Sequence, residues 1–238
     1  NFDEEIFLKT PIGIGSIAQV HRYDNVVIKI THPNIDNIIK QDLELLLEIN
    51  DLDIVDMLDS NVLKFFKLID LQKFANELYY QTNLINEKNN IELFNKKLKL
   101  DYIIYPKVYY SSKNVLIESF LKGNNISYYF ENIEKYKENI TKTVIMLLEM
   151  INIGLIHGDL HFGNILYNDD VIYLIDFGLI KEIDKDEIKK TKEIIRNIKE
   201  LFSYGKEEDS YYIIEIIKLL CKNLSDNDIE YILEKLNL

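Results

Sequence analysis

Between His157 and Gly178 the sequence places three side chains that together could hold a metal-bound phosphate: Asp159, Asn164 and Asp176. Phosphoryl transfer asks little covalent chemistry of a protein, but it needs magnesium held against the phosphates and an acceptor hydroxyl aimed in line. The spacing H-x-D-x-x-x-x-N, followed by D-F-G, is typical of that chemistry. We expect Asp159 to accept the proton of the acceptor. Asn164 and Asp176 are expected to bind Mg²⁺ through oxygen, the ligand atom that magnesium prefers.

Each part of this motif has a simpler explanation when it is taken alone. Asp-Phe-Gly is a common tripeptide, and a single histidine such as His157 or His161 is more often structural. Asp159 and Asn164 could be turn residues, because Gly158 and Gly163 mark loops. The order, the spacing and the apolar strand predicted at 171–175 nevertheless favour the phosphoryl-transfer interpretation when they are taken together.

A second motif lies near the N-terminus, P-I-G-I-G-S-I-A-Q-V-H at 11–21, followed after a short polar turn by V-V-I-K at 26–29. It predicts a glycine-containing hairpin in which backbone amides approach a phosphate; the residues concerned are Gly13, Ile14, Gly15 and Ser16. Lys29, at the end of a β-branched strand, is expected to meet the α- and β-phosphates of a nucleotide. A tight turn is the simpler explanation of the glycines alone, but the downstream motif favours a nucleotide site.

These segments resemble the UbiB family of aarF-domain atypical kinases, which are associated with coenzyme Q and other isoprenoid lipids. The resemblance rests on S-I-A-Q-V-H, K-x-x-H-P, H-G-D-L-H-F-G-N and D-F-G, and extends from about residue 2 to residue 180. It implies ATP and Mg²⁺ as cofactors and an α+β, bilobal, protein-kinase-like fold. The expected lobes are a small β-rich N-lobe (1–120) and a larger helical C-lobe (121–238) within one domain.

The resemblance also implies roles for two glutamates. Residues 77–86, E-L-Y-Y-Q-T-N-L-I-N, are similar to the family pattern E-L-D-Y-x-x-E-A-x-N, so Glu77 is expected to pair with Lys29 and orient it. A solvated charge on an amphipathic helix is the alternative for Glu77. Tyr79 and Asn83 replace an Asp and a Glu of the family pattern. The strand 114–120 is expected to lead into a hinge where Glu118 and the residues up to 121 offer backbone groups to adenine.

Two departures from the family pattern bear on mechanism. The family's A-A-A-S loop is replaced by Gly13-Ile14-Gly15-Ser16, and glycines relax the backbone that alanines would restrict. We therefore expect this loop to bind ATP in the way the glycine-rich loop of ordinary protein kinases does, rather than as the family's alanine-rich loop does. The family's N-terminal K-x-G-Q motif is not found in this sequence. Either it lies upstream of residue 1 or this member lacks it.

Helical periodicity accounts for much of the remaining chain. One or two helices are predicted within 62–94, and a long helix within 133–153 has Ile140, Val144, Leu147, Leu148 and Ile151 on one face. Amphipathic helices are predicted again from 185 to 236. No apolar run reaches the roughly 20 residues that cross a bilayer, so no transmembrane segment is expected.

Composition limits the function classes. The net charge of −12 argues against a broad nucleic-acid surface. Cys221 is the single cysteine, which excludes an internal disulfide and favours a reducing compartment for a soluble or peripheral protein; the compartment itself stays open.

The sequence thus predicts an Mg-ATP-dependent kinase or ATPase, with ATP or ADP and a lipid or isoprenoid-quinone-related compound as ligands. Two alternatives stay open. The catalytic loop also resembles that of the aminoglycoside and choline phosphotransferases, which act on small-molecule hydroxyls. A pseudokinase would bind nucleotide without turnover.

Overall fold

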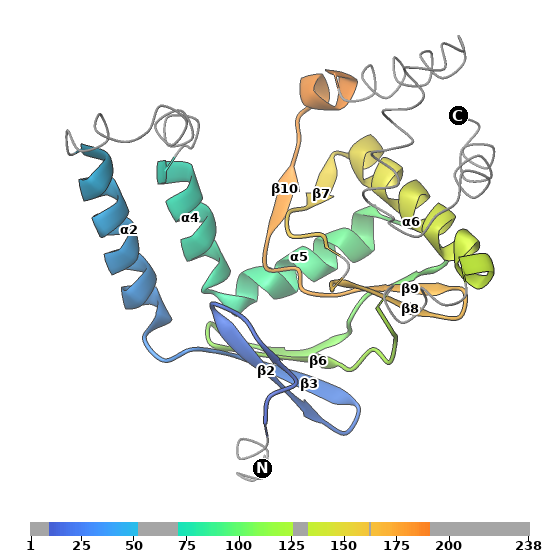
Figure 1. Cartoon of the computed structure of the whole chain (residues 1–238), viewed down its shortest axis with the longest axis horizontal. Helices are drawn as coiled ribbons and strands as arrows, with labels where there is room; N and C mark the ends of the chain where they lie inside the picture. The colour runs from blue at the N-terminus through green and yellow to red at the C-terminus, as the bar shows by residue number, and fades with distance from the viewer. Residues whose placement is uncertain (1–9, 52–70, 126–132, 162, 191–238) are drawn as a thin grey trace. The chain divides into compact units, whose positions relative to one another are not determined.

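We describe the chain from a computed structural model that defines residues 10–51, 71–125, 133–161 and 163–190 (Figure 1). The chain divides into two compact units, each described here by itself. The first comprises residues 1–90 and 107–120, and the second residues 91–106 and 121–238. The helices predicted beyond residue 190, with Cys221, and residues 62–70 of the predicted helical region lie outside the described residues.

The first unit contains a five-stranded sheet in the order β1-β2-β3-β6-β5. Its strands are antiparallel: β1 (Gly13–Ile14), β2 (Ala18–Tyr23), β3 (Val26–Thr31), β6 (Val115–Ser119) and β5 (Val108–Ser111). The turn between β2 and β3 contains Asp24 at φ 51°, a conformation that Asp adopts more readily than most residues. The predicted mixed α+β architecture with a β-rich N-terminal part is confirmed.

Three helices follow β3 along the chain: α2 (Ile35–Asp51), α4 (Leu71–Gln81) and α5 (Leu84–Lys97). Helices α2 and α4 pack side by side (Figure 1). The chain leaves α4 at Thr82, whose hydroxyl donates to the Tyr79 carbonyl at 2.8 Å. Asn83 then caps α5, because its side-chain oxygen accepts the Ile85 amide at 3.1 Å. The Asn83 that replaces a family glutamate therefore has a local structural role.

The second unit holds the long helix α6 (Ile133–Ile153), a parallel and antiparallel sheet β4-β9-β8, and the pair β7-β10. The strands are β4 (Ile103–Ile104), β9 (Val171–Leu174), β8 (Ile165–Asn168), β7 (Leu155–His157) and β10 (Ile180–Glu182). Figure 1 shows α6 beside the β8–β9 hairpin, with which it is in contact.

The buried face of α6 differs from the predicted one. Among its described side chains, Asn139, Thr143, Met146 and Met150 are buried, whereas Leu147 is 39% exposed. The buried residues recur at intervals of three and four, as a helix face must. The predicted set left out the two methionines and the two polar residues that are buried on this face. The buried hydroxyl of Thr143 has a hydrogen-bond partner, because it lies 2.9 Å from the hydroxyl of Tyr167.

Helix α6 ends at Ile153, and Gly154 directs the chain from it into β7. Gly154 has φ +71°, and a Cβ there would lie 2.8 Å from the Ile188 Cδ1 atom. Both the left-handed backbone and the close neighbour require glycine. No helix in the described part of the chain is long and apolar enough to cross a membrane.

Candidate active site

The glycine-containing loop connects β1 and β2 at one edge of the first unit's sheet. The Ile12 amide donates to the Val20 carbonyl at 2.8 Å, and the Gly15 amide to the Ala18 carbonyl at 2.9 Å. Ile14, the last residue of β1, is 72% exposed. A Cβ at Gly13 would have no neighbour closer than 3.8 Å and one at Gly15 none closer than 3.6 Å. The fold itself therefore does not require glycine at either position.

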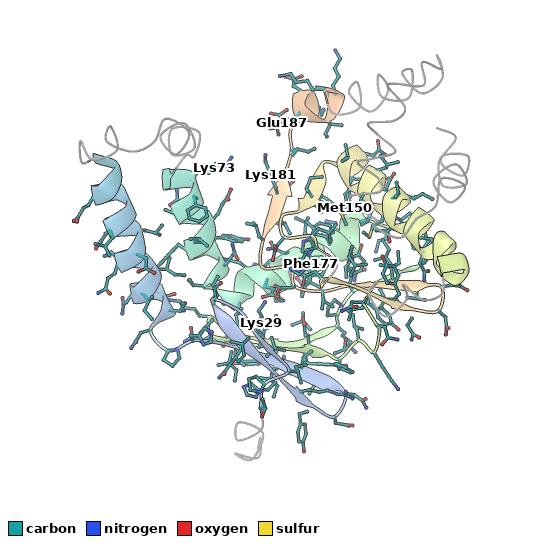
Figure 2. All side chains as sticks on the ribbon, viewed as in Figure 1. Lys29, Lys73, Met150, Phe177, Lys181 and Glu187 are labelled. Atoms are coloured by element: carbon teal, nitrogen blue, oxygen red, sulfur yellow. The ribbon has the colours of Figure 1, made fainter. Side chains whose placement is uncertain are left out.

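Lys29 lies in the middle of the sheet, paired in register with Val20 of β2 and Leu116 of β6 (Figure 2). Its ammonium group lies 2.9 Å from each carboxylate oxygen of Glu87, on α5. The Glu87 side chain is 3% exposed and that of Lys29 is 17% exposed. A charged pair this deeply buried holds both side chains in place, because separating them would leave a buried charge without its partner.

In this structure Lys29 therefore pairs with Glu87 and not with the expected Glu77. Glu77 lies on α4, the helix before α5. Helix α4 ends before Thr82 and Asn83, and a new helix, α5, begins at Leu84. It is this second helix that brings a glutamate to Lys29.

Glu118 lies inside the sheet rather than at its end. It is paired in register with Val27 of β3 and Val108 of β5. Just beyond the strand, the Phe120 amide donates to the Asn25 carbonyl at 2.8 Å. The expected adenine-binding role of the backbone from Glu118 to Leu121 stays a prediction.

In the second unit His157 organises the loop that carries Asp159. The Asp159 amide donates to Nδ1 of His157 at 3.3 Å, so Nε2 carries the proton and donates to the Ile175 carbonyl at 3.3 Å. His157 is buried, and burial lowers its pKa below the ordinary 6.5, outweighing the opposing effect of the nearby carboxylates. A neutral histidine thus joins the loop to the strand that leads to Asp176.

Asp159 and Asn164 are connected within that loop. The Asn164 side-chain nitrogen donates to the Asp159 backbone carbonyl at 2.8 Å. Because the side-chain nitrogen of Asn164 makes this bond, its side-chain oxygen is the atom that remains to bind a metal. The Asp159 carboxylate is 62% exposed, 4.0 Å from Nε2 of His161. An exposed carboxylate on a held backbone suits a group that must meet an external hydroxyl.

The β8–β9 hairpin brings Asp176 close to Asn164 in the fold. Ile165 pairs with Leu174, and the Ile175 amide donates to the Asn164 carbonyl at 3.1 Å. Asp176 follows directly and has φ +62°. Strained backbone of this kind persists where the surrounding structure enforces it, and it is frequent at functional sites. One carboxylate and one amide oxygen on adjoining strand ends fit magnesium, which takes a few oxygen ligands and leaves the rest to water and phosphate.

Phe177 fixes the turn after Asp176 because it is fully buried among aromatic rings (Figure 2). Its ring centroid lies 5.0 Å from that of His157, 5.1 Å from Phe94 and 5.9 Å from Tyr105. Such tilted contacts add to the stability that burial provides. Phe94, on α5, was not predicted as part of this region.

Each unit thus gathers its own set of site residues. In the first, the loop 13–16, Lys29 and Glu87 lie on connected elements. In the second, Asp159, Asn164 and Asp176 are joined by hydrogen bonds and by one hairpin.

The profile of the ABC1 atypical kinase-like domain matches residues 2–203, most of the chain. The chain belongs to the ABC1 family. The predicted membership of the aarF-domain atypical kinases is confirmed, since a mouse relative named AarF domain-containing protein kinase 1 is 29% identical over 76% of this chain and 37% of its own length.

Two further relatives frame the ABC1 domain. An uncharacterised Clostridium pasteurianum protein from a hydrogenase 1 5' region is 31% identical over 75% of this chain and 36% of its own length. A probable serine/threonine-protein kinase, abkC, from Dictyostelium discoideum is 28% identical over 79% of this chain and 27% of its own length. The chain therefore spans about a third of the length of these curated relatives.

A solved structure agrees in fold with the ABC1 domain. The Rv3197–erythromycin complex from Mycobacterium tuberculosis has a TM-score of 0.52 at 22% identity. The match covers 73% of this chain and 46% of that chain. At this identity the likeness shows the fold alone.

The buried neutral His157 predicts a dependence of stability on pH. Because its pKa is lowered in the folded state, the unfolded chain binds a proton first as the pH falls below about 6.5. The contribution of His157 is therefore complete above that pH and is lost progressively on acidification. We expect His157→Gln to cost about 1–3 kcal/mol near neutral pH but to flatten the decline below pH 6.5. Chemical unfolding of both proteins from pH 7.5 to 5.5 checks this, and equal slopes would contradict it.

Proposed function

We propose that this ABC1 domain binds Mg-ATP and either transfers the γ-phosphate to an unidentified acceptor or hydrolyses ATP. Membership of a kinase-like family supports nucleotide binding. The observation that carries the proposal is the linked set of Asp159, Asn164 and Asp176 on one loop and one hairpin, with Asp176 held at a positive φ. We further propose that the first unit corresponds to the N-lobe of a kinase-like fold and the second unit to its C-lobe.

Each residue has a defined task in this proposal. Lys29, held by Glu87, binds the α- and β-phosphates, while the amides of loop 13–16 approach the terminal phosphates. Asp159 accepts the proton from the acceptor hydroxyl or from water. Asn164 and Asp176 would hold Mg²⁺, which supplies positive charge against the phosphate oxygens.

The isoprenoid connection of the resembling family suggests a lipid or quinone precursor as acceptor or regulator. A small-molecule phosphotransferase is the second candidate, favoured by the exposed position of Asp159, which suits an acceptor arriving from solvent. Phosphate transfer to panels of isoprenoid quinone precursors and of amino-alcohols or sugars separates the two.

The proposal is tested by measuring nucleotide binding and phosphate release together. We expect ADP and ATP to raise the melting temperature of the wild-type chain, and Mg²⁺ to be required for release of phosphate from ATP. EDTA serves as the matched control, and candidate lipids are added in a parallel arm. Failure of both nucleotides to bind would overturn the proposal, whereas binding without release would favour the pseudokinase alternative.

The glycine loop gives a separate prediction. Gly13→Ala and Gly15→Ala should leave the melting temperature almost unchanged, because the nearest atoms to each new Cβ lie 3.8 Å and 3.6 Å away. If the glycines serve the approach of a nucleotide, the double variant should change the affinity for ATP relative to ADP by about tenfold, the scale of one hydrogen bond to a phosphate. Calorimetric titration of both nucleotides measures this. Unchanged affinities for both would show that the glycines have no part in binding.

A further inference from the structure

His32 lies directly after β3 and makes two hydrogen bonds to the glycine-containing loop. Its ring nitrogen Nε2 lies 2.9 Å from the Gly15 carbonyl oxygen, to which it donates. Its backbone amide donates to the Ile17 carbonyl at 2.9 Å. Residue 32 therefore bonds on both sides of Ser16, although 17 positions separate it from Gly15 in the chain.

The side-chain bond fixes the peptide group between Gly15 and Ser16. A trans peptide is planar, with its C=O and N–H pointing in opposite directions. Holding the Gly15 carbonyl toward His32 therefore turns the Ser16 N–H away from His32. Among the described residues that N–H has no acceptor, and Ser16 is exposed. An exposed backbone donor at a glycine loop is the kind of group that binds an anion.

The position of His32 is itself held by the chain around it. Thr31, the preceding residue, pairs with Ala18 of β2. Pro33 follows, and a residue before proline is restricted to extended conformations. His32 is also three residues beyond Lys29 and directly follows the strand that carries it, so β3 positions both the proposed phosphate-binding lysine and the residue that contacts the loop.

We propose that His32 is a positioning residue for phosphate recognition: by binding the Gly15 carbonyl it holds the Ser16 amide in the orientation that donates to the terminal phosphates of a nucleotide. The inference deepens the proposed function and depends on it. Without the imidazole, the Gly15–Ser16 peptide can rotate, because glycine restricts its own backbone little. In the variant this peptide must become ordered when the nucleotide binds, which weakens binding. In the wild type the peptide is already ordered before binding.

The test compares His32→Ala with His32→Gln. Glutamine places an N–H donor near the position of Nε2, so it serves as the conservative rescue. Dissociation constants for ATP, ADP and adenosine are measured for all three proteins. We expect His32→Ala to weaken ATP and ADP binding about tenfold and to leave adenosine, which has no phosphates, within about twofold. His32→Gln should recover most of the loss. A loss shared equally by adenosine would indicate a general structural role and overturn the inference.

A second measurement needs no nucleotide. Hydrogen–deuterium exchange of the peptide covering residues 12–18 should be faster in His32→Ala than in the wild type and in His32→Gln. Unchanged exchange would show that the imidazole does not hold the loop. If the wild type binds neither ATP nor ADP, the proposed function falls and the phosphate role of His32 with it. If the wild type binds both and His32→Ala binds them equally well, only the inference is overturned.

Discussion

Replacing Asp176 with asparagine should reduce phosphate release from Mg-ATP by about a thousandfold while the protein stays folded. The loss is of the size expected when a charged ligand that serves the transition state is removed. The fold should survive because Asp176 has φ +62°, and asparagine is one of the few residues that adopt this conformation readily. Alanine is a poorer test, since it adds backbone strain of about 1–2 kcal/mol. Steady-state phosphate release and thermal unfolding together measure the two effects.

The same hairpin offers a matched control. Asp169 lies in the turn between β8 and β9, has φ +49° and is exposed. Asp169→Asn is thus the same chemical change at a similar backbone conformation, outside the predicted metal ligands. We expect it to leave phosphate release within about twofold, as surface substitutions usually do. Equal rates in the wild type and Asp176→Asn would instead favour a nucleotide-binding protein without turnover.

The sequence was enough to predict that the candidate site residues of the second unit lie close together. Asp159, Asn164 and Asp176 lie within one loop and one hairpin, so their spacing and the apolar strand before Asp176 are enough to bring them together. The position of the strand that carries Lys29 also depends on contacts close in the sequence, because β2 and β3 form a hairpin whose register is set by its turn. The assignment of the chain to its family rested on these same local motifs.

The pairings across long separations could not be predicted in the same way. Lys29 and Glu87 lie 58 residues apart, and nothing in either local sequence specifies the other. A signal was present, however. Buried residues of α5 recur at intervals of three and four (Leu84, Glu87, Ile91 and Phe94), and Asn90 is buried beside them. A glutamate buried beside Leu84, Ile91 and Phe94 needs a cation or hydrogen-bond donors to offset the cost of its burial. Glu77 has no such setting, because Tyr80, three residues further along α4, is 42% exposed.

Helix α5 is the element whose importance the motifs understated. Phe94, on the same stripe, contacts Phe177 and His157 through its ring. The sequence motifs consist of polar residues close to glycines. An aromatic residue within a helix, such as Phe94, belongs to no such motif. The periodicity of α5 shows that Phe94 is buried, but the identity of its ring partners follows only from the fold.

Replacing Glu87 with glutamine should therefore reduce kcat/KM for ATP about a hundredfold, a loss typical of removing the group that orients a catalytic residue. Glutamine has nearly the same shape, but it offers one oxygen in place of two and turns an N–H toward the Lys29 ammonium. Glu77→Gln is the matched control: the same change on the neighbouring helix, at a half-buried side chain, with an expected effect within about twofold. Thermal unfolding of both variants separates loss of fold from loss of orientation. If Glu77→Gln were the more damaging of the two, Lys29 would have to exchange its partner when nucleotide binds, and the pair seen in this structure would not be the one that supports turnover.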